Sequence, residues 1–131
     1  MKTDTQLFEA FEYGTLLVDD KSVNLAEIAW WNHPKFEGVA LKHLITSAQS
    51  DGAFSFHLVR IAPHKTIETH IHENELETHE VIGGSGRCIK EGVTFAYGKG
   101  NISIFPQKTP HSIHADAEGL YLLAKFFPAL C

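Results

Sequence analysis

The sequence predicts an all-β sandwich or barrel. From about residue 38 onward, short segments rich in β-branched and aromatic residues alternate with turns that contain glycine or proline, and no long helical pattern occurs there. Short strands at even spacing, separated by such turns, are typical of β-sandwiches and barrels. The predicted strands cover residues 39–45, 54–61, 67–72, 77–82, 87–90, 93–97, 101–105, 111–114 and 120–127.

A glycine-rich segment, Gly83-Gly84-Ser85-Gly86, separates two of these predicted strands. Glycine takes positive φ angles without strain, and such angles are what tight turns require. The segment is therefore predicted to be a turn. Glu91-Gly92 is predicted to form a second tight turn on the same grounds.

The N-terminal part of the chain is less clearly patterned. Residues 7–11 could form one face of a helix or a short strand, and the apolar run 16–18 predicts a strand. Trp30 and Trp31 are adjacent, and adjacent side chains on a strand point to opposite faces. Simple core and surface packing is the expected role of the two; the alternative is that one packs inward while the other covers a partner or the mouth of a pocket.

Composition excludes several classes of protein. The chain has 131 residues, 44% of them hydrophobic, which is enough for one domain with a genuine core. A net charge of −5 without a basic block argues against nucleic-acid binding, and no apolar run is long enough to span a membrane. The start of the chain lacks the apolar core of a signal peptide, and two cysteines do not make a disulfide framework. A cytoplasmic location is expected.

Histidine is the one residue type in unusual number and distribution. Five of the nine histidines lie within residues 57–79, and the stretch 70–79 combines three histidines with three glutamates. His70 and His72 are two apart, so on a strand both rings point to the same face, and Glu77 returns a carboxylate after a short loop. Imidazole nitrogens and carboxylate oxygens are ligands for divalent metals.

A second segment, residues 100–111, completes the pattern. Pro106 ends a strand, a short loop follows, and His111 opens the next strand after a stiffening Pro110. With these two segments the chain resembles the cupin family, whose two motifs place glycines, histidines, a glutamate and a proline at this spacing. The positions in step with the motifs are His70, His72, Glu77, Gly84, Gly100, Pro106 and His111. The chain departs from the motifs at His64, Lys108 and Ala115, where cupins vary.

This resemblance implies a double-stranded β-helix, the cupin jelly-roll barrel, with an N-terminal extension. It covers roughly residues 50–128, so we expect a barrel over 46–131 and an extension over 1–45 that packs on the barrel or on a partner subunit. Small cupins often pair, and exposed strand edges invite such pairing. A homodimer is therefore expected.

The resemblance also implies a metal centre. Carried over position by position, the ligands are His70, His72, Glu77 and His111. Three neutral imidazoles and one carboxylate suit one divalent transition metal per chain (Fe, Mn, Ni, Co or Zn) and leave one or two coordination positions open. Glu75 is an alternative ligand if the loop before Glu77 is shorter than we expect.

His79 is the candidate catalytic residue. It lies two residues beyond Glu77, so both side chains point inward if the segment is a strand. It could be a fifth ligand, a residue that orients a ligand, a general base, or a hydrogen-bonded core histidine. Among the other histidines, His57 lines the barrel or faces solvent, and His114 lies on the opposite strand face from His111. The remaining three are expected in loops or on the surface: His33, His43 and His64.

Two functions follow from this pattern. The first is a metal-dependent enzyme of the dioxygenase, isomerase or lyase type, which binds a small molecule at the open coordination position. The second is a non-catalytic barrel that binds or senses a small ligand. A storage role is not expected for one short barrel without cysteine bridges. The fold alone cannot choose the reaction, because cupins host many chemistries.

Overall fold

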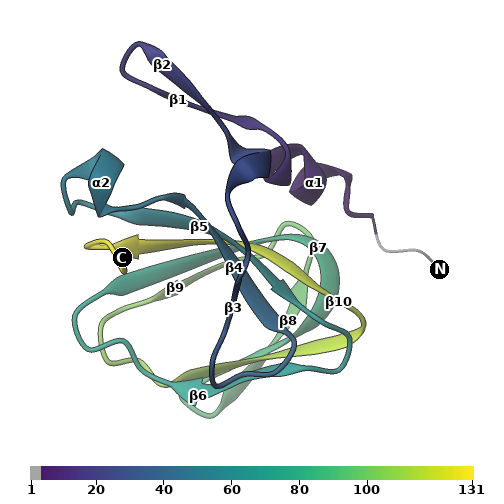
Figure 1. Ribbon diagram of the computed structural model, residues 1–131. Helices are drawn as coiled ribbons and strands as arrows, with labels where there is room; N and C mark the ends of the chain where they lie inside the picture. The colour runs from purple at the N-terminus through teal and green to yellow at the C-terminus, as the bar shows by residue number, and fades with distance from the viewer. Residues whose placement is uncertain (1–3) are drawn as a thin grey trace.

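Two long strands, β7 (Leu76–Lys90) and β10 (His111–Phe127), pair along most of their length and organise the fold. In the computed structural model, which describes residues 4–131, each long strand changes neighbours halfway (Figure 1). The C-terminal half of β10 pairs with β5 (Ser55–Ile61), and its N-terminal half pairs with β6 (Thr66–His70). All of these pairings are antiparallel, and the predicted all-β jelly-roll barrel is confirmed.

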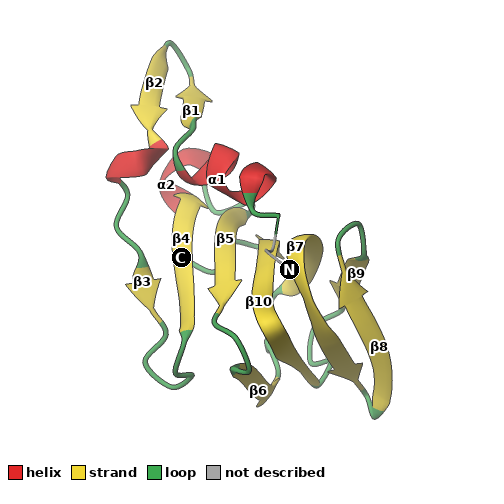
Figure 2. Ribbon diagram, turned by 90° about the vertical axis from the view of Figure 1, so that its right-hand side faces the viewer, coloured by secondary structure: helices red, strands yellow, loops and turns green. Residues whose placement is uncertain are grey.

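The strand β7 is shared between two neighbours in the same way. Its first part pairs with β9 (Ile102–Phe105) and its last part with β8 (Val93–Gly98). Beyond β5, the sheet continues through β4 (Val39–Ile45) to the short β3 (Trp31–Asn32), as Figure 2 shows. The two long strands therefore pass from one layer of the barrel to the other.

The predicted turn at residues 83–86 is wrong, because these residues lie inside β7. Gly84 has a φ of +74°, and a side chain there would overlap the main-chain oxygen of Gly119; one at Gly86 would overlap that of His114. The glycines therefore allow β7 and β10 to approach closely where both strands bend, and the register shifts between Ala115 and Leu120. The predicted strands 111–114 and 120–127 are likewise two parts of β10.

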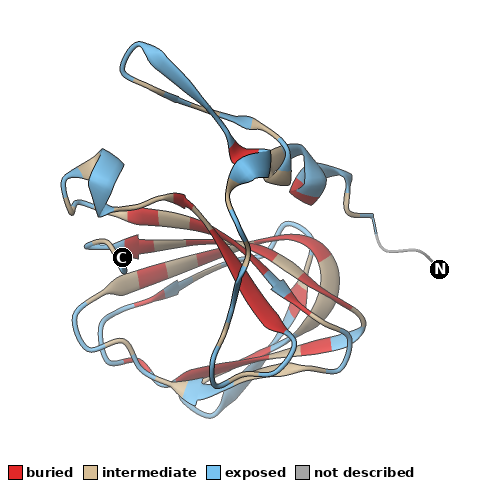
Figure 3. Cartoon of the chain, viewed as in Figure 1, coloured by how far each residue is buried: buried red, intermediate tan, exposed pale blue. Residues whose placement is uncertain are grey.

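The barrel interior is apolar and draws on most strands. Val59 and Ile61 of β5 face inward, while Leu58 faces the outside of the barrel and is also buried. Consecutive residues of this strand are accordingly buried, and buried residues follow one another along the barrel strands in Figure 3. Cys88 is buried in the interior cluster, where it packs as a small apolar group, as expected for a lone cysteine.

The N-terminal segment covers the outer face of β4 and β5. It comprises α1 (Gln6–Glu12), the hairpin of β1 (Thr15–Val18) and β2 (Lys21–Asn24), and the 3-10 turn η1 (Leu25–Glu27). Of the two alternatives for residues 7–11, a helix or a short strand, the helix is correct. Phe8 and Leu25 pack against Leu58 and other apolar side chains of the barrel, and Lys42 Nζ donates to the main-chain oxygens of Glu12 and Leu25 at 2.8 and 2.6 Å.

The division at residue 45 stays a prediction. β4 precedes it in sequence, yet it pairs along its length with β5 of the barrel. Residues 1–3 of the predicted extension lie outside the described residues.

The helices are short and peripheral. α1 has 7 residues, and α2 (Ser47–Ser50), capped by Thr46 and Gln49, has 4. Within residues 4–131, no helix is long and apolar enough to cross a membrane. The cytoplasmic location stays a prediction.

Candidate metal centre

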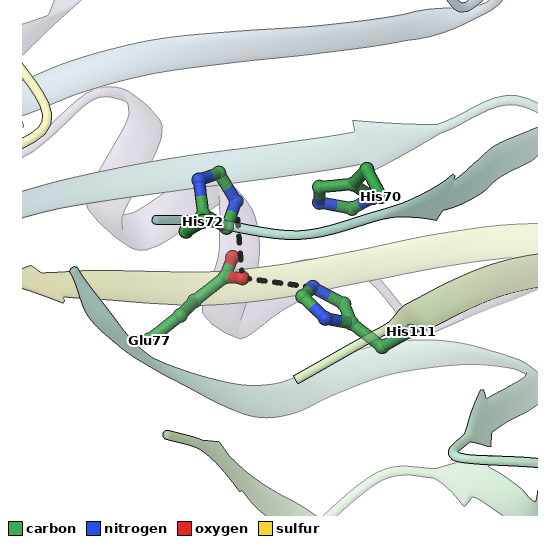
Figure 4. Close-up of side chains that lie close together, drawn as sticks. All are labelled: His70, His72, Glu77 and His111. Atoms are coloured by element: carbon green, nitrogen blue, oxygen red, sulfur yellow. Dashed lines mark hydrogen bonds and ion pairs between the residues drawn. The ribbon is translucent and has the colours of Figure 1, made fainter. Parts of the chain in front are cut away.

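The structure brings together the four residues that the resemblance gave as ligands, here called the histidine–glutamate cluster: His70, His72, Glu77 and His111. His70 ends β6 and His111 begins β10, and the two are opposite each other in the strand pairing. Glu77 is the second residue of β7. His72 lies in the loop after β6, not on the strand as predicted, but its ring still turns toward Glu77 (Figure 4).

The four side chains converge on a small volume. One ligand atom from each lies within 4.8 Å of the corresponding atom of every other member. His111 Nε2 is 3.0 Å from Glu77 Oε1, and His72 Nε2 is 3.5 Å from the same oxygen. This is the donor set of a mixed nitrogen and oxygen metal site.

Main-chain carbonyls fix the orientation of two rings. His70 Nδ1 lies 2.9 Å from the oxygen of Glu68, and His111 Nδ1 lies 2.8 Å from that of Thr109. A carbonyl oxygen can only accept, so each Nδ1 carries the proton and donates it. In the neutral ring Nε2 then holds a lone pair. For His111 this lone pair faces the carboxylate oxygen of Glu77, and two lone pairs in contact repel each other. A cation bound between the two atoms would remove this repulsion, so the residues fit a bound metal.

The electrostatics of the cluster favour the protonation states that a metal requires. Burial raises the pKa of Glu77, but the neighbouring rings of His79 and His111 outweigh it and hold this pKa below its ordinary value. Burial lowers the pKa of His70 to about 4 and also lowers that of His72. At neutral pH Glu77 is therefore ionised, and the rings of His70 and His72 are neutral.

His79 is buried beside the cluster but does not belong to it. Its Nε2 donates to Glu77 Oε2 at 2.8 Å, and its Nδ1 lies 3.1 Å from the hydroxyl of Tyr97. A carboxylate only accepts, so Nε2 carries the proton and Nδ1 accepts from Tyr97. Both ring nitrogens are thus engaged in hydrogen bonds.

The other acidic neighbours lie outside the cluster. Glu75 Oε1 is 3.8 Å from His72 Nδ1, on the side of the ring away from Glu77. Glu80 faces away from Glu77, as alternation predicts, and binds Lys125.

A cavity of about 520 Å³ opens onto the cluster. Within the described part of the chain, no lysine or arginine lines it. Lys42 and Lys125 are held by partners elsewhere, and the guanidinium of Arg60 lies 4.1 Å from the ring centre of Trp30. Apolar side chains supply most of the wall: Trp31, Phe36, Val39, Leu41, Val59, Ile67, Ala124, Phe126 and Leu130.

Two histidines that were expected in loops or on the surface line this cavity. For His43 the expectation is wrong, because it lies on β4 and shares the inward face with Val39 and Leu41. The alternation of the predicted strand 39–45 was the signal that could have found it. His33 does lie in a loop, but it is half-buried against the ring of Phe36 and also lines the cavity. His64 is exposed in a loop as expected.

The structure also decides the expectations for the two tryptophans and for two further histidines. Trp31 is 43% exposed at the cavity, while Trp30 stacks on Phe8 beneath the N-terminal segment. His57 is fully buried, so of its two alternatives the interior one is correct. His114 bonds Thr66 and Ser112, away from the cluster.

Comparisons with known proteins agree with this geometry. A model described as the cupin domain matches residues 57–124, a range that includes the whole histidine–glutamate cluster. The comparison with curated proteins found no match.

Solved structures share the fold. KdgF from a Halomonas species is 19% identical with a TM-score of 0.68, over 79% of this chain and 90% of KdgF. A predicted oxalate decarboxylase from Thermotoga maritima is 22% identical with a TM-score of 0.68, over 86% and 99% of the two chains. An RmlC-like cupin from Shewanella frigidimarina is 15% identical with a TM-score of 0.69, over 80% and 87%.

Proposed function

The chain belongs to the cupin family, and we propose that it is a metal-dependent enzyme that acts on a small, largely apolar molecule. The histidine–glutamate cluster would bind one divalent transition metal, and the substrate would occupy the adjoining cavity. The observation that carries this proposal is a pair of hydrogen bonds to main-chain carbonyls, which leave His70 Nε2 and His111 Nε2 as lone-pair donors of the histidine–glutamate cluster.

The residues at this site have distinct roles. A metal held there would act as a Lewis acid or activate O2. Glu77 supplies the one negative charge among the four ligands, which partly neutralises a divalent cation. His79 acts as a positioning residue, because it holds Glu77 Oε2 and so leaves Oε1 toward the cluster. The apolar wall keeps water from the bound substrate and strengthens the electrostatic interactions inside.

The lining of the cavity supports a neutral substrate. A dianion such as oxalate would find no cationic side chain on the described wall, and only the metal would balance its charge. A molecule with one or two oxygen donors and an apolar or aromatic body would coordinate the metal and bury its body against Trp31, Phe36 and Leu41. Dioxygenase, isomerase and lyase chemistry are all compatible with such a substrate.

Non-catalytic ligand binding is the second candidate. The observation that favours it is the environment of His79, whose two ring nitrogens are both engaged, so that it is not free to take a proton from a substrate. Turnover separates the two candidates, since both require the metal and the cavity.

The first experiment measures metal by plasma mass spectrometry in protein purified without chelators. His72→Ala and His111→Ala are each expected to lose about one equivalent per chain relative to wild type, while the control His114→Ala loses none. Unchanged metal content in both variants would overturn the ligand assignment.

The second experiment tests substrate class. Phenols, diketones and small dicarboxylates are offered to the metal-loaded protein, and binding, product formation and oxygen uptake are measured. Turnover of an apolar oxygen donor supports the enzyme, binding without turnover supports the second candidate, and preferential binding of oxalate contradicts the assignment of the cavity.

We also propose that the protein forms a homodimer through the β1–β2 hairpin. The hairpin projects away from the barrel (Figure 1), and Leu17 is 77% exposed on the face that it shares with Ser22. An isolated two-stranded hairpin is at best marginally stable in water. A second copy of the chain packed on this face would bury the side chain of Leu17.

A further inference from the structure

We propose a second transition-metal site in the wall of the same cavity, formed by His43, His57 and Cys131 and suited to Zn²⁺. One nitrogen of each ring and the thiol sulfur lie within 4.8 Å of one another, the same limit that the histidine–glutamate cluster meets. No residue is shared between the two groups. The proposal goes beyond the proposed function and does not require it.

The two histidines are placed by neighbouring strands. His43 on β4 and His57 on β5 are opposite each other in the strand pairing, and their Nδ1 atoms are 2.8 Å apart. His43 is half-buried and reaches the cavity, while His57 lies behind it and is fully buried. Two nitrogen ligands therefore face the same point from a rigid part of the sheet.

The third ligand is brought to this point by separate hydrogen bonds. Ser55 Oγ lies 2.8 Å from His57 Nε2 and accepts the main-chain N–H of Leu130 at 2.9 Å. The main-chain oxygen of Cys131 accepts both the N–H and the hydroxyl of Ser47, at 2.8 and 3.0 Å. The segment that carries the thiol is thus tied to the imidazole pair. Cys131 is exposed and lines the cavity, which leaves a route for an ion.

The donor chemistry selects a borderline or soft cation. Two imidazoles and one thiolate are ligands that Zn²⁺ accepts in tetrahedral sites, with the fourth position left to water. When the ion binds, the Cys131 thiol releases its proton to solvent. The metal also replaces the proton that lies between the two Nδ1 atoms. His43 then carries its proton on Nε2, and His57 donates Nε2–H to Ser55. This bond to Ser55 orients the ring as partners of metal-bound histidines do.

The two sites are neighbours but chemically distinct. The ring of Phe126 contacts both, at 5.5 Å from the His57 ring and 4.9 Å from the His72 ring. The histidine–glutamate cluster offers a carboxylate and no sulfur, whereas the second site offers sulfur and no carboxylate. A spectroscopic band from a metal-bound thiolate therefore reports on the second site alone.

The test is a titration of the metal-free full-length chain with Co²⁺, which replaces Zn²⁺ and is visible spectroscopically. Wild type is expected to bind two equivalents, one of them with a near-ultraviolet thiolate-to-cobalt charge-transfer band. Cys131→Ser should lose that band and weaken the corresponding Zn²⁺ affinity by at least about 100-fold, because even the outer partners of metal ligands are worth 10–100-fold. Cys88→Ala, which removes the other cysteine, should keep both. His43→Gln is expected to behave as Cys131→Ser does.

The same titration tests the second site independently of the histidine–glutamate cluster. His72→Ala should lose the equivalent without sulfur and keep the charge-transfer band, so the failure of either site is seen independently. Circular dichroism confirms that each variant is folded. A single equivalent in wild type without the band would overturn the proposal and leave His43 and His57 as a hydrogen-bonded pair. A band that persists in Cys131→Ser, or that disappears in His72→Ala, would also overturn it.

Discussion

At the residue scale, the carboxylate of Glu77 connects the histidine–glutamate cluster with His79. Its Oε1 faces His111 and His72, and its Oε2 accepts from His79. One side chain thus belongs both to the cluster and to the hydrogen-bonded chain that runs through His79 to Tyr97. Changes at His79 should therefore reach the metal through Glu77 and not by direct coordination.

Replacing His79 by glutamine tests this positioning role. We expect the metal to remain bound in His79→Gln but its affinity to fall by about 10–100-fold, the usual cost of losing a partner that orients a ligand. Competition with a chelator measures this affinity, and His114→Gln serves as the control because His114 lies away from the cluster. Complete loss of the metal would make His79 a ligand, and an unchanged affinity would show that Glu77 needs no support.

His57 provides a pH-dependent prediction at the same scale. Burial lowers its pKa from 6.5 to about 4, so between these values the unfolded chain takes up a proton that the folded chain does not. Its contribution to stability is complete above pH 6.5 and is lost as the pH falls toward 4. With 1.36 kcal/mol per pKa unit, this amounts to about 3 kcal/mol.

The measurement is urea denaturation of the metal-free protein at pH 7 and pH 4. In His57→Asn the fall in the free energy of unfolding between these two pH values should be smaller than in wild type by about 3 kcal/mol. His64→Asn is the matched control, since His64 is an exposed loop histidine with a positive φ that asparagine tolerates. An equal fall in His57→Asn and wild type would refute the prediction.

At the element scale, the bend shared by β7 and β10 depends on glycines that meet across the strands. Gly84 and Gly92 both have positive φ angles, +74° and +81°. A side chain at Gly84 would overlap the backbone of Gly119, whereas nothing lies within 4 Å of one at Gly92. Alanine substitutions at these two glycines therefore separate the loss of stability due to backbone conformation from the loss due to crowding.

We expect Gly92→Ala to destabilise the protein by about 1 kcal/mol, the cost of a left-handed conformation for alanine. Gly84→Ala should cost a further 1–3 kcal/mol or so, because the two strands must move apart. Denaturant midpoints of both variants measure this difference. Equal losses in the two variants would mean that the close approach at Gly84 contributes nothing to stability.

The same glycines show why the sequence predicted most strands but not their continuity. A positive φ at Gly84 suits a turn as well as a bend within a strand, and the choice depends on Gly119, which is distant in the chain. Local alternation and turn residues predict where strands lie, because these signals act between near neighbours. Whether two segments join into one long strand is decided by the partner strand.

The candidate site was predictable to the extent that its residues follow local spacing. The members of the histidine–glutamate cluster fall at motif positions, and the structure brings them together. His43 was missed, although its strand was predicted and its alternation with Val39 and Leu41 places it on the inward face. Its pairing with His57 could not be foreseen, since the register of two strands is fixed by long-range packing.

At the scale of the whole molecule, the N-terminal segment and the barrel support each other. Phe8 and Leu25 cover the outer side of β5, so that this strand is buried on both faces and its inward side forms a firm cavity wall. Lys42 secures the contact through two main-chain oxygens. The hairpin β1–β2 is the part of this segment that extends beyond the barrel (Figure 1).

The proposed dimer is tested at the tip of this hairpin. Leu17→Asp places a charge where Leu17 is now 77% exposed, and burying that charge in an interface is costly. We expect wild type to sediment as a dimer and the dissociation constant of Leu17→Asp to rise at least about tenfold, or 1.4 kcal/mol. Ile102→Asp is the matched control, because Ile102 is 73% exposed on β9, away from the hairpin. A monomeric wild type at micromolar concentration, or dissociation caused by Ile102→Asp alone, would show that the hairpin is not the interface. If the dimer depends on Leu17, the hairpin gains from the second subunit the apolar contacts that a two-stranded ribbon cannot make by itself.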